Sequence, residues 1–254
     1  MNKYKQNYPA FLMIIFAILI WEGYVAISQI EKYILPPPSQ IIIAFLEQWD
    51  IIFQHSKVTI YEALMGYFVA LLISIILAVI IDNNRFFKQG FYPILVASQT
   101  IPIIAIGPLI TAWFGFGILP KVLVVALVAF FPIVINMIDG FNSTDKDLIN
   151  LLKTMKATKW QIFFKVKIPS ALPNTFSGLR IAATYSVMGA VIGEWLGASK
   201  GLGIYIRNAS NSYLIAQVFA AIIVIVAISI VFYSALLLAE RLIIPWNRES
   251  KEEI

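Results

Sequence analysis

Long apolar segments separated by shorter polar ones dominate the chain. The apolar segments at residues 10–27, 58–81, 91–112, 119–138, 172–196 and 213–238 are each long enough to cross about 30 Å of hydrocarbon as an α-helix. Their apolar residues are contiguous and lack the alternation of a transmembrane β-strand. The pattern therefore predicts an all-α membrane protein with six transmembrane helices, forming a single domain over residues 1–254.

The polar insert between the fourth and fifth spans, residues 139–171, is itself helically patterned. Its apolar side chains recur at three- and four-residue spacing and continue after a break at residues 157–158: Leu148, Leu151, Leu152, Met155, Trp160, Phe163 and Phe164. Its polar sides carry six lysines: Lys146, Lys153, Lys156, Lys159, Lys165 and Lys167. We expect two short amphipathic helices, which either form a docking surface for a soluble partner or lie on lipid headgroups.

Prolines predict where several of these helices are interrupted. Ile168 and Pro169 are expected to end the second helix of the insert, because proline has no backbone N–H to donate, and Pro173 to begin the fifth span. Pro102, Gly107 and Pro108 are expected to break the third span, and irregular backbone at membrane depth is tolerated where it lines a cavity.

Composition and charge support a membrane location. With 60% hydrophobic and 13% charged residues, the chain has too little polar surface for a water-soluble globule. Of its 19 Lys and Arg, only five fall on the side opposite the N-terminus: Lys32, Lys57, Lys121, Lys200 and Arg207. This asymmetry predicts a multi-pass protein of the cell membrane with both termini cytoplasmic. It also accounts for the net charge of +5 without nucleic acid as a partner.

The first span has two interpretations. A basic start, an apolar stretch and small residues at Ala26 and Ser28 are typical of a cleaved signal peptide. Glu22 and the bulky residues around it fit a retained span better, and we expect retention.

Chemistry-bearing residues are sparse. The chain has no cysteine and one histidine, His55, which we expect to be a solvated surface residue. No catalytic site, metal site or cofactor is therefore expected. Polar residues within the spans are costly in hydrocarbon and mark pathway or gate candidates, namely Gln99, Thr100, Tyr185, Ser186, Met188 and Glu194, the last at the outer end of the fifth span.

The insert resembles the EAA loop of ABC importer permeases, whose pattern is Glu-Ala-Ala, three residues, Gly, nine residues, then Ile-x-Leu-Pro. The pattern falls on Asn150, Leu151 and Leu152, then Lys156, then Val166, Ile168 and Pro169. Its spacing is kept, whereas Lys156 stands where the glycine allows a turn at positive φ. Five further segments in order resemble permeases of the nitrate, sulfonate and taurine type: LPPPSQ (35–40), TIYEALMGYFVA (59–70), QTIPIIAIGPLITAWFGFGILPK (99–121), FFPIVINMIDG (130–140) and GEWLGASKGLGIYI (193–206).

This resemblance implies a non-catalytic membrane subunit of an ATP-driven importer of a small solute. Two copies of this chain, or this chain with a closely related permease, would form the pathway. Two cytoplasmic ABC ATPase subunits would dock on the insert, and an extracytoplasmic solute-binding protein would deliver the solute. The docking residues implied are Leu148, Leu151, Leu152, Met155, Lys156, Trp160, Phe163 and Phe164. The absence of a GxxxxGK[ST] motif agrees, since the chain has no phosphate-binding loop of its own.

Two points stay open at this stage. SGLRIAATYSV (177–187) is similar to family members that import thiamine-pathway pyrimidines, so the solute is either such a pyrimidine or a nitrate-, sulfonate- or taurine-like molecule. The alternative function is a secondary transporter or channel subunit that works without an ATPase. No inverted pair of matching halves supports that alternative in the sequence.

Overall fold

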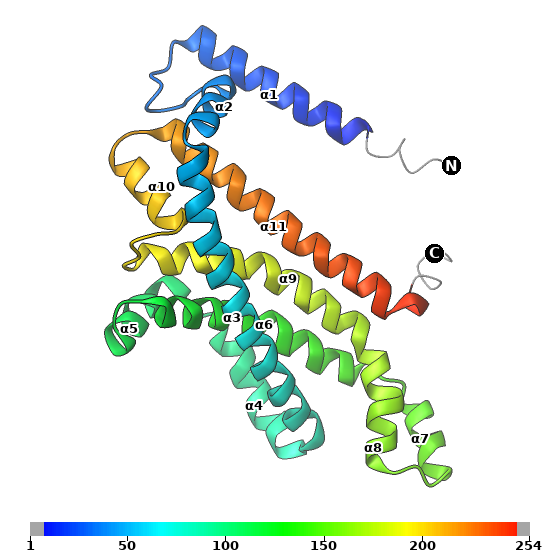
Figure 1. Ribbon diagram of the computed structural model, residues 1–254. Helices are drawn as coiled ribbons and strands as arrows, with labels where there is room; N and C mark the ends of the chain where they lie inside the picture. Colours follow the sequence, from blue (N-terminus) through cyan, green and yellow to red (C-terminus); the bar gives the residue numbers. More distant parts are fainter. Residues whose placement is uncertain (1–7, 248–254) are drawn as a thin grey trace.

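The computed structural model describes residues 8–247, which are helical without any strand (Figure 1). In chain order the helices are α1 (Tyr8–Ser28), α2 (Pro38–Glu47), α3 (Trp49–Asn83), α4 (Arg85–Ser98), α5 (Ile103–Phe114), α6 (Ile118–Asn142), α7 (Lys146–Thr154), α8 (Lys159–Ile162), the π-helical turn η2 (Phe163–Lys167), α9 (Ile168–Trp195), α10 (Leu202–Asn211), α11 (Ile215–Ile243) and the 3₁₀ turn η3 (Pro245–Asn247).

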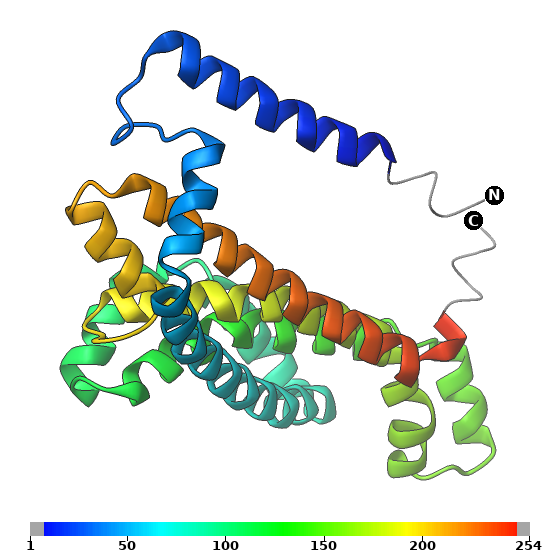
Figure 2. The same ribbon diagram turned by 45° about the horizontal axis from the view of Figure 1, so that its top comes forward.

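Five helices within the described residues are long and apolar enough to cross a membrane, and the number rises to six when α4 and α5, bent by 98°, are counted as one broken span. This agrees with six spans predicted from the sequence. In Figures 1 and 2 the start of α1, the end of α11 and the pair α7–α8 lie at one end of the spans, whereas α2 and α10 lie at the other. Lys3, Lys5, Arg248 and Lys251, which contribute to the predicted charge asymmetry, lie outside the described residues.

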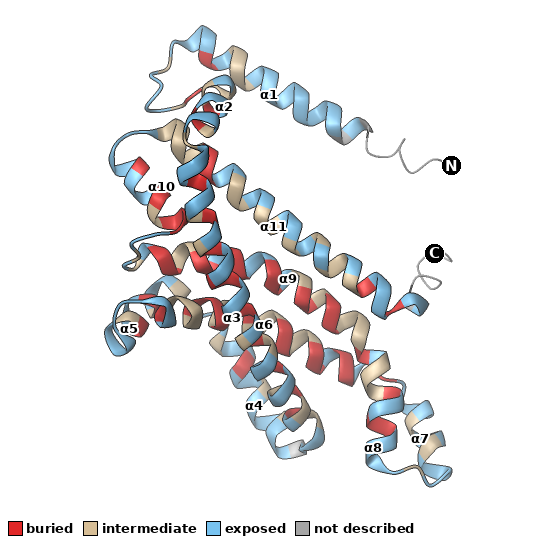
Figure 3. Cartoon of the chain, viewed as in Figure 1, coloured by how far each residue is buried: buried red, intermediate tan, exposed pale blue. Residues whose placement is uncertain are grey.

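The core is formed by α3, α6 and α9, where the buried residues are concentrated (Figure 3). Small residues allow these helices to approach closely. A Cβ on Gly178 of α9 would lie 2.7 Å from the Cβ of Asn136 on α6, and one on Gly189 would lie 3.2 Å from the Cα of Val125. The two small residues between them, Ala182 and Ala183, are fully buried. This contact is the small-residue packing typical of membrane helices.

The fifth span differs from the prediction at its start. Ile168 and Pro169 do not end a helix, because α8 runs through η2 into α9 and the three form one segment, Lys159–Trp195. Pro169 lies in the first turn of α9, directly after the wider π turn. Proline has no N–H to bond into the turn before it, and here that turn is a π turn, a form that occurs as a single turn within longer helices.

Candidate functional sites

The first candidate site is a pocket at the bend of the broken span. The chain leaves α4 at Ser98 and re-enters a helix at Ile103, with Pro102 in an extended conformation between them. The Oγ1 of Thr100 donates to the carbonyl of Ala97 over 2.7 Å, and the Oγ of Ser98 donates to the carbonyl of Leu95 over 2.9 Å. The same two carbonyls also accept from backbone N–H groups, that of Leu95 from Gln99 over 3.3 Å and that of Ala97 from Thr100 over 3.2 Å, so the side chains add a second bond to each at the end of α4.

Of the three residues expected to break the span, only Pro102 lies at the break. Gly107 and Pro108, which we had also expected to interrupt the span, lie inside α5. Gly107 is buried, and the Oγ1 of Thr111 donates to its carbonyl over 3.2 Å. Pro108 also lies inside α5, where the helix lacks the one hydrogen bond that its missing N–H would donate.

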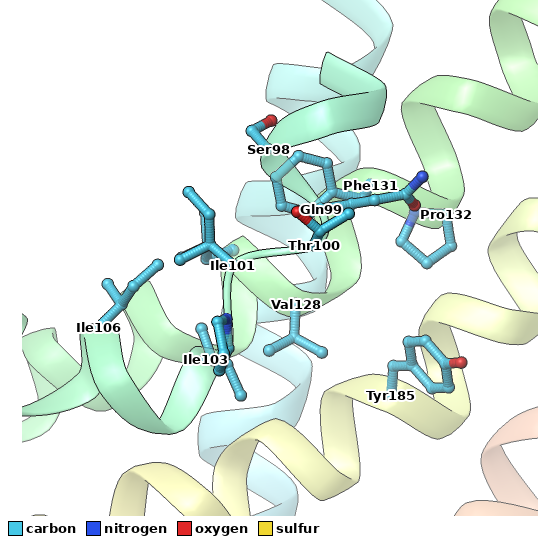
Figure 4. A pocket seen from close by; sticks show the side chains of 12 residues that line it. Ser98, Gln99, Thr100, Ile101, Ile103, Ile106, Val128, Phe131, Pro132 and Tyr185 are labelled. Atoms are coloured by element: carbon cyan, nitrogen blue, oxygen red, sulfur yellow. The ribbon is translucent and has the colours of Figure 1, made fainter. Parts of the chain in front are cut away.

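The pocket encloses about 420 Å³ between the bend, α6 and α9 (Figure 4). Gln99 and Thr100 reach it from the bend, Val128 and Phe131 from α6, and Tyr185 from α9. Of the described residues that line it, none carries a formal charge at neutral pH. The walls therefore offer an amide, hydroxyls and aromatic faces to a solute, and no counter-ion.

Three of the six predicted pathway or gate residues meet in this pocket, namely Gln99, Thr100 and Tyr185. Ser186 does not, because it is fully buried in the helix core and its Oγ donates to the carbonyl of Ala183 over 2.8 Å. Met188 lies one helical turn beyond Tyr185 and is half exposed. The sequence analysis missed Phe131 and Val128, because nothing distinguishes them from other apolar residues of the span.

Glu194, the sixth candidate, lies at the end of α9 in a buried polar cluster. Its Oε1 accepts from the Oγ1 of Thr59 on α3 over 2.6 Å, and its Oε2 accepts from the N–H of Gly203 on α10 over 2.5 Å. Thr59 in turn accepts from the N–H of Leu202 over 2.9 Å. Through these bonds the carboxylate joins α3 and α9 to the first turn of α10.

The loop between α9 and α10 fits tightly onto this cluster. Gly201 has a φ of 128°, which disfavours any other residue, and a Cβ there would lie 2.6 Å from the Oε2 of Glu194. The N–H of Gly201 donates to the Nδ1 of His55 over 2.9 Å. His55 is therefore a partly buried support for the loop, and the expectation of a solvated surface histidine was wrong.

A buried ion pair lies next along α3. The Nζ of Lys121, at the start of α6, lies 2.8 Å from the Oε1 of Glu62. Glu62 is 1% exposed, and a buried carboxylate of this kind needs such a partner. Thr59, Glu62 and Gly66 share one face of α3 at three- and four-residue spacing, which is the sequence signal that could have identified this cluster.

The second candidate site is the amphipathic insert. Asp145 caps α7 by accepting from the N–H of Asp147 over 2.8 Å, and Thr158 caps α8 through a reciprocal bond pair with Gln161. Lys156 adopts a φ of 60° between the two helices. The turn therefore keeps the positive φ that the resemblance implied, with a lysine in place of glycine.

The insert exposes apolar side chains on one side. We define the insert face as five of the predicted docking residues, all exposed: Leu148, Leu151, Met155, Trp160 and Phe164. The rings of Trp160 and Phe164 stack with centroids 5.8 Å apart. Phe163, by contrast, is buried against Phe141, so it supports the insert from within, and Leu152 is only partly exposed.

Comparison with known proteins gives consistent results. Residues 70–248 match the family of inner membrane components of binding-protein-dependent transport systems. A formylaminopyrimidine transport permease protein, ThiX of Halalkalibacterium halodurans, is 36% identical over 96% of this chain and 99% of its own length. A riboflavin transport system permease protein, RibX of Chloroflexus aurantiacus, is 35% identical over 94% of this chain and 89% of its own length.

The fold is shared with a solved structure of an ABC transporter. A chain of the MetNI methionine ABC transporter, in an inward-facing conformation, superposes with a TM-score of 0.63 over 77% of this chain and 97% of its own length. At 19% sequence identity this likeness bears on the fold alone.

Proposed function

The chain belongs to the family of inner membrane components of binding-protein-dependent transport systems, and we propose that two cytoplasmic ABC ATPase subunits drive it through the insert face. As the permease subunit of an ABC importer for a small solute, it is a multi-pass membrane protein. The family thus favours an importer permease over the alternative of a secondary transporter or channel. An extracytoplasmic solute-binding protein and a second permease copy complete the proposed assembly.

The observation that carries the proposal is the exposure of the insert face. Trp160 and Met155 are 65% and 70% exposed on short helices that project beyond the ends of the spans (Figure 1). Exposed aromatic and apolar side chains of this kind mark a protein interface. The same end carries the insert lysines, and the bias of lysine toward the cytoplasm supports a cytoplasmic location for the insert and both termini.

Two variants of α7, one changed on the insert face and one on the opposite side, test the docking. Replacing Leu148 and Leu151 with Asp is expected to release the ATPase and abolish uptake. Each leucine that docking buries contributes about 2 kcal/mol to the contact, and the two new charges would face an apolar surface. The permease should remain in the membrane. Co-purification of the ATPase and uptake into cells are the measurements.

Asn150→Asp is the matched control, since it places a charge on the same helix but on the side opposite the insert face. It should retain the ATPase. Unchanged co-purification and uptake in the double leucine variant would contradict the proposal.

For the solute we propose a neutral heteroaromatic molecule of the thiamine-precursor pyrimidine class. The pocket at the bend supports this choice, because Phe131 and Tyr185 offer aromatic faces and Gln99 offers an amide that both donates and accepts. Relatives named for nitrate, taurine or sulfonates are 26% to 30% identical. The pocket offers no basic side chain to pair with a nitrate or sulfonate group.

Identifying the small molecule carried by the cognate binding protein tests the solute class. Mass spectrometry of the purified binding protein is expected to find a pyrimidine, which should also raise its melting temperature. A sulfonate, taurine or nitrate as the stabilising ligand would overturn the assignment while leaving the importer function intact.

A further inference from the structure

A second pocket, of about 470 Å³, lies on the other side of α7 from the insert face. From α7 it is lined by Lys146, Ile149, Asn150 and Lys153, whose three- and four-residue spacing defines one side of the helix. Leu148, Leu151 and Met155 of the insert face occupy the opposite side. The pocket is therefore separate from the proposed ATPase contact.

Lysines dominate the charge of this pocket. Its charged residues are Lys146, Lys153, Lys159, Lys167 and Asp82. The side chain of Asp82 is almost fully buried, and both of its carboxylate oxygens accept from the Nζ of Lys167, over 2.9 and 2.7 Å. The other three lysines form no ion pair with an acidic residue of the described chain. Three ammonium groups are thus available to an anion.

The remaining walls fix where the pocket opens. Asp82 and Asn83 are the last residues of α3, and Lys167 directly precedes α9. Both helices are long enough to cross a membrane, so the pocket lies where two spans leave the hydrocarbon. The buried Ile162 and Phe163, with the partly buried Ile149, supply an apolar surface beside the lysines.

We propose that this pocket binds the phosphate group of an anionic phospholipid. A lipid headgroup and free phosphate share the same chemistry, a phosphate oxyanion held by several ammonium groups. Basic pockets between spans on the cytoplasmic side favour lipid headgroups. The lipid is preferred over free phosphate because the pocket combines lysines with apolar side chains at the ends of two spans. It is preferred over an acidic surface of the ATPase because the pocket opens between α7 and α3.

A pair of double variants tests the site in the purified transporter complex. Native mass spectrometry with phosphatidylglycerol is expected to show bound lipid on the parent, and little with phosphatidylcholine. Lys153→Gln with Lys159→Gln should weaken phosphatidylglycerol binding roughly 30-fold, because each lysine near an anionic membrane contributes about a fivefold gain in affinity. Lys165→Gln with Arg241→Gln is the matched control, since it removes the same charge from two exposed positions outside the pocket and outside the predicted docking residues, and it should bind as the parent does.

Three outcomes would overturn the proposal. Equal loss of lipid in both double variants would indicate a general effect of charge. Millimolar inorganic phosphate that displaced phosphatidylglycerol completely would assign the pocket to a free anion. Undiminished lipid binding with loss of the ATPase from the Lys153, Lys159 variant would assign the lysines to the ATPase interface.

Discussion

At the scale of single residues, Glu194 is held tightly by its neighbours. Its carboxylate accepts from a threonine of α3 and from the backbone of α10, and Gly201 packs against it without room for a Cβ. We predict that this cluster is part of the external gate of the importer, because one side chain holds the glycine-containing loop 196–201 onto two spans. Breaking and remaking such bonds gives a two-state element of the kind that alternating access requires.

Replacing Glu194 with Gln should change uptake and the coupling of binding-protein docking to ATP turnover, without preventing assembly. The amide brings a donor where two donors already meet the carboxylate, so one hydrogen bond, of about 1 kcal/mol, is lost. Transport rate, stimulated ATPase rate and yield of the assembled complex are the measurements. Glu22→Gln is the control, because Glu22 is another outer acid that accepts from Ser39 but lies outside the cluster. Parent-like transport and stimulation in Glu194→Gln would reduce the residue to a structural anchor.

At the scale of helices, the sequence identified the elements better than their ends. Length and apolarity are local properties, so the spans and the amphipathic insert could be predicted. Proline had opposite effects at two places that look alike in the sequence. Pro102 follows the end of α4 and accompanies a bend of 98°, whereas Pro169 lies in the first turn of α9 and leaves the segment continuous. Pro169 follows the π turn η2, and no local sequence pattern indicates such a turn.

The sites were predictable to a similar, partial extent. Gln99, Thr100 and Tyr185 stood out because polar residues within spans are rare, and the structure brings them into one pocket. The bond from Thr59 to Glu194 joins residues 135 positions apart, and the pair of Asp82 with Lys167 joins residues 85 apart. No periodicity links such partners, because their proximity follows from how α3 packs on α9.

At the scale of the whole molecule, the described chain does not close its pathway. Gln99, Thr100 and Tyr185 remain exposed at membrane depth, where an amide or hydroxyl facing hydrocarbon would cost several kcal/mol, of order 2–7. Met188 extends the same side of α9 by one turn. By contrast, α11 exposes mainly apolar residues (Figure 3), which suit lipid. This asymmetry predicts that a second permease copy covers α9 and the bend.

Single cysteines can test that arrangement, because the chain contains none. Met188→Cys is expected to form a cross-linked permease dimer in membranes on treatment with a short thiol-specific reagent, since both copies would present α9 to the shared pathway. Val231→Cys on α11 is the control, being 69% exposed and expected to face lipid, and it should stay monomeric on gels. Cross-linking should also block uptake in the Met188→Cys variant alone. A transport-competent complex that contains only one copy of this chain would contradict the prediction. This holds whether lipid or a different permease covers α9 in that complex.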